Sequence, residues 1–272
     1  MPRPSSSQPG PRFWRDPALP QVEAREVADG RLLCYERHWH ETFSVGAITS
    51  GRSTYLNGEH AEQVEQGTLV FMNPGEVHAC NPIDGQPWSY RMLYVDTGWL
   101  ASLQPDGRFR PYAARSLRSP RLYGHYMAMF DALLDPACAP LRRDELLVGF
   151  FTRLEPATGE PDPPPARLER AAAYIDAHFA APLRLEDIAA AAGLSVSYLV
   201  RAFRQRYGMA PHEYQVNRRI QHGKAGLRAG LPIAQAALEA GFADQAHFQR
   251  IFKRLTAATP GQYRGRPERG AA

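Results

Sequence analysis

Basic and amide side chains recur at matching positions in two segments near the C-terminal end of the chain. The first set is Ser197, Val200, Arg201, Arg204 and Gln205, and the second set is Gln245, Ala246, Gln249, Arg250 and Lys253. Spacings of three and four residues place most of each set on one face of a helix. Arginine can pair with guanine and glutamine with adenine through two hydrogen bonds, and arginine and lysine also neutralise phosphates. Both faces therefore suit recognition of double-stranded DNA.

The two segments are copies of one internal repeat. Six pairs of similar residues share an offset of 49 residues: Leu199 and Phe248, Arg201 and Arg250, Phe203 and Phe252, Arg204 and Lys253, Pro211 and Pro260, Tyr214 and Tyr263. A glycine that can take the left-handed conformation of a tight turn precedes each of these helices, Gly193 in one copy and Gly241 in the other. Each copy is therefore predicted to form a helix-turn-helix unit.

A linker helix is predicted between the copies, from Pro211 to Arg228. Proline suits the first turn of a helix because its missing N–H is not needed there. Such a helix is about 25 Å long, which can hold two recognition helices near one turn of DNA apart, ~34 Å. Its cationic side chains are expected to reach backbone phosphates: Arg218, Arg219, Lys224 and Arg228.

The charge of the chain is divided unevenly. Residues 1–165 carry a net charge of −4 and residues 166–272 carry +8, which together give the +4 of the whole chain. A basic half is a candidate polyanion binder, since phosphate neutralisation dominates non-specific affinity for nucleic acids. The three cysteines are widely and irregularly spaced, which predicts reduced thiols and a cytoplasmic location. No apolar run is long enough to predict a membrane span.

The N-terminal half is predicted to be a β domain of residues 21–98, after a disordered lead of residues 1–20. Four strands are predicted: Thr42–Thr49, Ser53–Leu56, Gly67–Met72 and Tyr90–Val95. Asn57-Gly58 is typical of a type I′ hairpin turn. Short strands with such turns predict a small barrel or jelly roll.

Helices are predicted to follow the barrel. Residues 99–155 form a helical region with helices at 117–134 and 140–154, whose apolar stripes could pack on the barrel or form a dimer. Residues 156–165 form a proline-rich linker. Residues 166–266 form the double helix-turn-helix domain, and 267–272 a tail. The predicted fold class is α+β multidomain, with a barrel domain followed by an all-α domain.

The C-terminal segment from about Leu168 to Arg266 resembles the AraC/XylS family of bacterial regulators. The diagnostic motifs are Ala-Gly-Phe242, Phe248-x-x-x-Phe252-Lys253 and Thr259-Pro260-x-x-Tyr263-Arg264. The resemblance implies base-reading positions at Ser197, Val200 and Arg201 in the first unit, and at Ala246, Gln249 and Arg250 in the second. Two departures exist: Arg184 and Pro232 stand where the family usually has a capping serine or threonine, and Val200 and Ala246 could read only thymine methyls.

The β region resembles the cupin-like effector domain of these regulators, through His38-Trp-His40-Glu41 and the stretch from Gly67 to His78. The resemblance implies an effector pocket, with these candidate residues: His38, His40, Glu41, Tyr55, Glu76, His78 and Tyr94. His38, His40 and His78 are also metal candidates, since alternate residues of a strand share a face. Metal-binding cupins add a glutamate about four residues after the second histidine, where this chain has Ser44 and Val45. We therefore predict no metal and no cofactor, and strand-end histidines satisfied by the backbone stay an alternative.

Taken together, the sequence predicts a transcription regulator, an activator by resemblance. Its predicted partners are promoter DNA, a small-molecule effector, RNA polymerase and a second copy of the chain. No association with a membrane is predicted. An effector would shift the balance between two domain arrangements that differ in affinity for it. Two other classes remain open: a metal-dependent cupin oxygenase fused to a DNA-binding domain, and a structural DNA-binding protein without sequence preference.

Overall fold

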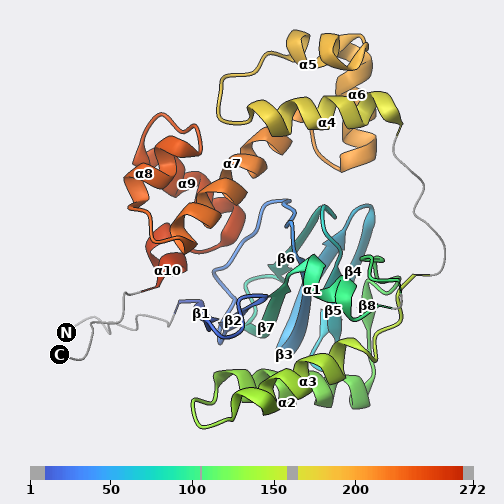
Figure 1. Ribbon diagram of the computed structural model, residues 1–272, viewed down its shortest axis with the longest axis vertical. Coiled ribbons are helices and arrows are strands. Elements are labelled where there is room, and N and C mark those ends of the chain that lie inside the picture. The colour runs from blue at the N-terminus through green and yellow to red at the C-terminus, as the bar shows by residue number, and fades with distance from the viewer. Residues whose placement is uncertain (1–9, 105, 158–164, 266–272) are drawn as a thin grey trace.

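The computed structural model describes residues 10–104, 106–157 and 165–265. They form a sheet-rich N-terminal domain with three helices and an all-helical C-terminal domain that lies against it (Figure 1). The predicted α+β multidomain fold is thus confirmed. The C-terminal tail, residues 1–9 of the predicted lead and residues 158–164 of the predicted linker lie outside the described residues. None of the described helices is long and apolar enough to cross a membrane.

Eight antiparallel strands make up the sheet, in the order β1-β2-β7-β3-β5-β8 with β4 and β6 also paired to β3. Their bounds are β1 Arg12–Arg15, β2 Val22–Val27, β3 Phe43–Asn57, β4 His60–Glu65, β5 Leu69–Met72, β6 His78–Pro82, β7 Trp88–Val95 and β8 Ser116–Leu117. A register shift between Ile48 and Ser50 divides β3. Its first half pairs with β5 and β7, and its second half with β4 and β6. Two strands that the sequence predicted separately are therefore one.

Two local predictions in this domain are wrong. The hairpin after Asn57 is not a type I′ turn, because only Gly58 of its two loop residues has a positive φ, of 61°. The disordered lead is contradicted at Arg12–Arg15, which form β1 on the edge of β2. The ring of Phe13 in β1 also packs on the ring of Tyr263, with centroids 5.2 Å apart. These contacts join opposite ends of the chain, so no local pattern announces them.

Helices α1 (Thr97–Ser102), α2 (Pro120–Leu134) and α3 (Pro140–Phe151) follow the strands. α2 and α3 lie on the side of the sheet domain away from the C-terminal helices (Figure 1). Buried Tyr126 ties α2 to the sheet, because its hydroxyl donates to the carbonyls of Val45 and Arg91 at 3.0 Å. α2 begins three residues later than predicted, since Ser119 caps it and Pro120 takes its first position.

The C-terminal domain contains two helix-turn-helix units joined by one helix, as the repeat predicts. Its helices are α4 Ala166–His178, α5 Leu185–Ala192, α6 Val196–Tyr207, α7 Pro211–Arg228, α8 Ile233–Glu239, α9 Gln245–Thr256 and α10 Pro260–Arg264. Leu199 and Phe203 of α6 are buried against α4 and α5. Phe248 and Phe252 of α9 are buried in a separate cluster with α7 and α8. Each unit thus has its own small core, and α7 connects them.

Candidate functional site

The predicted reading faces of α6 and α9 lie at the surface. Ser197, Arg201, Arg204 and Gln205 on α6, and Gln245, Ala246, Arg250 and Lys253 on α9, are exposed, and Val200 and Gln249 are half-buried. Side-chain caps begin both helices, since Ser195 accepts from the N–H of Tyr198 and Asp244 from that of His247. In each helix the phenylalanine and leucine face turns inward. The structure therefore brings each predicted set together on the solvent side of its helix.

One exposed aromatic residue on α6 escaped the sequence prediction. Tyr198 is 47% exposed, and the guanidinium of Arg201 lies 5.7 Å from the centre of its ring. The i, i+3 spacing is the signal that could have identified this pair. Contact with the tyrosine ring restricts the arginine side chain.

Three of the four α7 cations that are expected to reach DNA phosphates already have partners within the chain. Arg218 pairs with Glu41 of the β domain and with Asp176 of α4. Arg219 donates to the carbonyls of Phe179, Ala180 and Ala181. The amine of Lys224 lies 5.4 Å from the ring centres of Tyr94 and Tyr263. Arg228 alone of the four is exposed. Most cations of α7 therefore hold domains and units together.

Three histidines meet inside the β domain. His38, His40 and His78 are 6%, 7% and 3% exposed, and their ligand atoms all lie within 4.8 Å of one another. His38 and His78 lie side by side because their backbones exchange N–H···O bonds of 3.1 and 2.9 Å. Residues 38 and 40 share a face, as predicted, so His40 joins them, with ring centroids 4.9 and 4.6 Å from those of His38 and His78.

Hydrogen bonds fix the tautomers of two of these rings. Nδ1 of His38 donates to the carbonyl of Glu36, and Nδ1 of His78 donates to the carbonyl of Glu76, both at 2.8 Å. Burial lowers the pKa of all three imidazoles, to about 4 for His78 and well below the usual value for His38 and His40, where the neighbouring histidines lower it further. The three rings are therefore neutral at pH 7, with Nε2 of His38 and His78 carrying a lone pair.

The other predicted effector residues are distributed over several places. Tyr94 joins the histidines, with its ring 5.0 Å from that of His40. The hydroxyl of buried Tyr55 donates to the carbonyl of Phe71. Glu76 binds the backbone N–H of Asn73 and so holds a turn. Glu41 is exposed and pairs with α7. The structure does not bring Tyr55, Glu76 or Glu41 to the histidine cavity.

The cavity beside the histidines is small and mainly aromatic. Its volume is about 30 Å³, enough for a water molecule or two. The sequence prediction missed several residues that line it, which come from four strands and one loop: Tyr35, Ile48, Met72, Cys80, Trp88, Tyr90 and Met92. Strand alternation could have indicated Trp88, Tyr90 and Met92, since they share the face of Tyr94.

Two basic side chains lie where this cavity meets the C-terminal domain. Arg25 is 2% exposed and donates through NH1 to the carbonyl of Thr256, and its guanidinium lies 5.2 and 5.3 Å from the ring centres of Phe13 and Tyr35. Lys224 lines the same interdomain space, and burial lowers its pKa to about 8. The carboxylate of Glu23, which pairs with Arg15, lines the same space.

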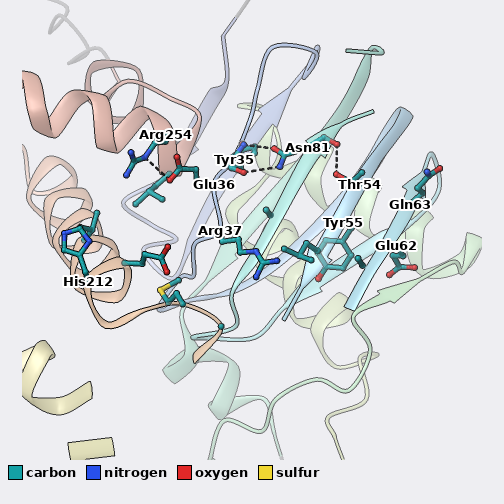
Figure 2. Close-up of a pocket in the computed structure, with 18 residues that line it drawn as sticks. Tyr35, Glu36, Arg37, Thr54, Tyr55, Glu62, Gln63, Asn81, His212 and Arg254 are labelled. Carbon is teal, nitrogen blue, oxygen red and sulfur yellow. Dashed lines mark hydrogen bonds and ion pairs between the residues drawn. The ribbon is translucent and has the colours of Figure 1, made fainter. Parts of the chain in front are cut away.

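A wider cleft of about 870 Å³ opens between the two domains. Glu36, Arg37 and Thr54 line its wall in the β domain, and His212 and Arg254 come from the C-terminal domain (Figure 2). The ion pair of Glu36 with Arg254, at 2.8 Å, bridges the domains at this cleft. Tyr55 also lines this cleft, so one predicted effector residue lies here and not at the histidine cavity.

The segment His38–Glu41 connects the cavity to α7. His38 and His40 line the cavity, whereas Trp39 and Glu41 between and after them contact the C-terminal domain. The carbonyl of Trp39 accepts from Asn217 at 3.3 Å and from Gln221 at 2.9 Å. Its indole, 5% exposed, packs with Val77, Met209 and Tyr214. The residues that line the cavity therefore alternate with residues that contact α7, the helix that joins the two helix-turn-helix units.

Comparisons with known proteins agree with this arrangement. An AraC-like ligand binding domain matches residues 22–150, and a helix-turn-helix domain matches residues 188–266. The HTH-type transcriptional regulator YbfI of Bacillus subtilis is 26% identical over 246 residues, covering 85% of this chain and 87% of that protein. The arabinose operon regulatory protein of Escherichia coli is 27% identical over 217 residues, covering 73% and 72%. A crystal structure of ToxT from Vibrio cholerae has the same fold, with a TM-score of 0.59 at 13% identity, covering 93% of this chain and 98% of that one.

A ligand-binding β domain joined to two helix-turn-helix units defines a class of transcription regulators that read DNA and respond to a ligand. Within that class, the matched ligand-binding domain is AraC-like, and the relatives that cover most of the chain include arabinose operon regulatory proteins. The chain belongs to the AraC family of transcriptional regulators.

Proposed function

We propose that this regulator binds specific promoter sequences through α6 and α9, under the control of a small molecule that binds in the interdomain cleft or enlarges the cavity beside the three histidines as it enters. The observation that carries this proposal is the pair of exposed reading faces on one connecting helix, α7, which is itself packed on the ligand-binding domain. Arg201 and Arg250 are the base readers with the strongest chemistry, and the +8 charge of residues 166–272 supplies the phosphate attraction.

The coupling between effector and DNA runs through His38–Glu41. An effector that moves His38 or His40 also moves Trp39, whose carbonyl holds two amides of α7. A shift of this segment changes those two hydrogen bonds, so we expect the cavity and α7 to change conformation together. One of the solved ToxT structures holds an unsaturated fatty acid, which supports a small organic ligand for this fold.

Further parts of the proposal concern assembly and output. We propose a homodimer formed through α2 and α3, where Leu141 is 70% and Val148 38% exposed. Four helix-turn-helix units would then meet the promoter. We further propose activation through RNA polymerase in the cytoplasm. No catalytic role is proposed, since the relatives are regulators.

Selection of bound duplexes from a random pool tests sequence reading directly. The purified chain is expected to enrich one motif with two half-sites about one helical turn apart, because α6 and α9 read separate stretches of major groove. Repeated rounds that enrich no motif, with equal affinity for every duplex, would instead indicate a structural DNA-binding protein.

The substitution Trp39→Ala tests the connection between the domains. Removing the indole deletes its packing with Val77, Met209 and Tyr214, a loss of roughly 3 kcal/mol for a buried tryptophan. We expect the domains to separate, which small-angle X-ray scattering measures as a larger radius of gyration. The matched control is Trp99→Ala, since Trp99 packs on the β-domain core and against Phe151. An equal radius in both variants contradicts the proposed coupling.

A further inference from the structure

The three histidines of the cavity are held in a more defined arrangement than residues that only line a cavity need. All three are buried on one side of the β domain, and the described hydrogen bonds occupy only their Nδ1 atoms. A buried nitrogen lone pair without a partner costs free energy. The Nε2 atoms of His38 and His78, which carry the lone pairs, make no hydrogen bond with the described residues, and the ligand atoms of all three histidines lie within 4.8 Å of one another.

We propose that His38, His40 and His78 bind one divalent transition-metal ion, of which Zn²⁺ is the representative, through their Nε2 atoms. The site goes beyond the proposed function and does not depend on it, since α6 and α9 can read DNA whether or not a metal binds.

The distances suit such an ion. Tetrahedral Zn²⁺ with Zn–N bonds of about 2.0 Å places its ligand nitrogens roughly 3.4 Å apart and their ring centroids roughly 5 Å apart. The three pairs of ring centroids here are 4.9, 4.5 and 4.6 Å apart. The ligand atoms, all within 4.8 Å of one another, are up to about 1.4 Å farther apart than in such a site, so the rings have to rotate for all three to bind one ion.

The outer partners of the rings are those of metal ligands. Ligating histidines usually donate the other ring N–H to a carbonyl, a carboxylate or a water, which fixes the tautomer and aims the free nitrogen. His38 and His78 donate in this way to the carbonyls of Glu36 and Glu76, and Nδ1 of His40 lies 3.0 Å from the hydroxyl oxygen of Ser44. Ser44 is the residue at the position where metal-binding cupins have a glutamate. Here it supports a ligand.

The charges around the three histidines indicate which kind of ligand completes the metal site. The ligand cluster contains no carboxylate, and the positive charges of Arg25 and Lys224, which oppose protonation of the histidines, also oppose a bound cation unless an anion accompanies it. Glu23, the acidic residue of the interdomain space, is already paired with Arg15. An ion held by three neutral ligands keeps its full charge, so the open coordination position, facing the cavity, binds an anion. In the proposed regulator that anion belongs to the effector, and this last step alone rests on the proposed function.

Zn²⁺ and Co²⁺ binding to the untagged, chelator-treated full chain tests the site. One Zn²⁺ per chain is expected by titration calorimetry, with a melting temperature several degrees higher, and Co²⁺ should give the intense visible absorption of a tetrahedral ion. His78→Gln should lose both effects. His60→Gln, which changes an exposed histidine paired with Glu62, should keep them. Azide should alter the Co²⁺ spectrum if the fourth position is open.

Several results would overturn the proposal. They are no stoichiometric binding by the wild-type chain, an octahedral Co²⁺ spectrum, or equal binding by His78→Gln and the wild type. Should His78→Gln unfold, Ser44→Ala gives the second measurement, because it removes a support of His40 without removing a ligand, and it is expected to weaken Zn²⁺ binding about 10-fold or more. Unchanged affinity in that variant counts against the site. Failure here leaves the motif selection untouched, which separates this inference from the proposed function.

Discussion

Replacing Arg250 with alanine is expected to weaken binding to the selected duplex by roughly 1–3 kcal/mol, about 5- to 150-fold, with little change on random DNA. The arginine is exposed on α9, and no described residue pairs with its guanidinium, so the side chain is available for two hydrogen bonds to a guanine. Arg201→Ala on α6 is expected to have an effect of the same size. Gel-shift titrations at one fixed salt concentration measure both losses, since salt alone changes such affinities strongly.

Arg206→Ala is the matched control for this prediction. Arg206 is an exposed arginine of the same helix as Arg201, but it extends toward the ring of Tyr207, away from the reading face. Its loss should reduce affinity for all duplexes equally and slightly. If Arg201→Ala and Arg250→Ala weaken random and selected duplexes to the same extent, the two arginines contact phosphates and do not read bases.

The second large effect is expected at the turn of the second unit. An added Cβ at Gly241 would lie 2.2 Å from the carbonyl oxygen of Ala180, a backbone atom that cannot move aside, and the φ of 79° adds strain. Gly241→Ala is expected to cost about 3 kcal/mol in the free energy of unfolding, at the upper end of the usual range for one substitution. Thermal melting should show a decrease of roughly 6–12 °C for a chain of this size.

Gly193 provides the comparison. It occupies the corresponding turn of the first unit with a φ of 64°, but nothing lies within 4 Å of its added Cβ. Gly193→Ala should therefore cost only about 1 kcal/mol, the cost of a left-handed alanine. Equal melting temperatures for the two variants would show that the contact with Ala180 is not what requires the glycine.

The contact between Gly241 and Ala180 is also expected to affect DNA binding. Ala180 belongs to the segment between α4 and α5, so Gly241 is where the second unit rests on the first. Gln215 and Arg219 of α7 bind carbonyls of the same segment. Pushing the units apart changes the relative placement of α6 and α9. Gly241→Ala should therefore weaken binding to the two-half-site duplex more than to a single half-site, which Gly193→Ala should not.

The sequence by itself determined the reading helices and their order along the chain. Their faces follow from helical periodicity, because buried Leu199, Phe203, Phe248 and Phe252 oblige the polar residues between them to face water. The turn glycines and the offset of 49 residues are likewise local in origin. Such features survive in a linear pattern since each helix is specified by residues a few positions apart.

The roles of the cations of α7 were decided by the tertiary structure. Arg218 meets Glu41 across 177 positions of sequence, and Arg15 reaches the carbonyl of Tyr263 across 248. From the pattern alone, these residues are basic positions of an amphipathic helix or an edge strand, equally able to face DNA or a second domain. Only the packing of the two domains shows which of these the side chains face, because an ion pair depends on its partner and the partner lies far away in the sequence.

The histidine cluster stands between these two cases. The sequence brought out His38, His40 and His78 by their types and their strand alternation, and it assigned Tyr94 to the same place. It could not show that the rings meet within ligand distance, that two of them donate Nδ1–H to carbonyls, or that Arg25 and Lys224 approach them. Those facts depend on how β3, β6, β7 and α7 pack around one small cavity, and packing is a property of the folded chain as a whole.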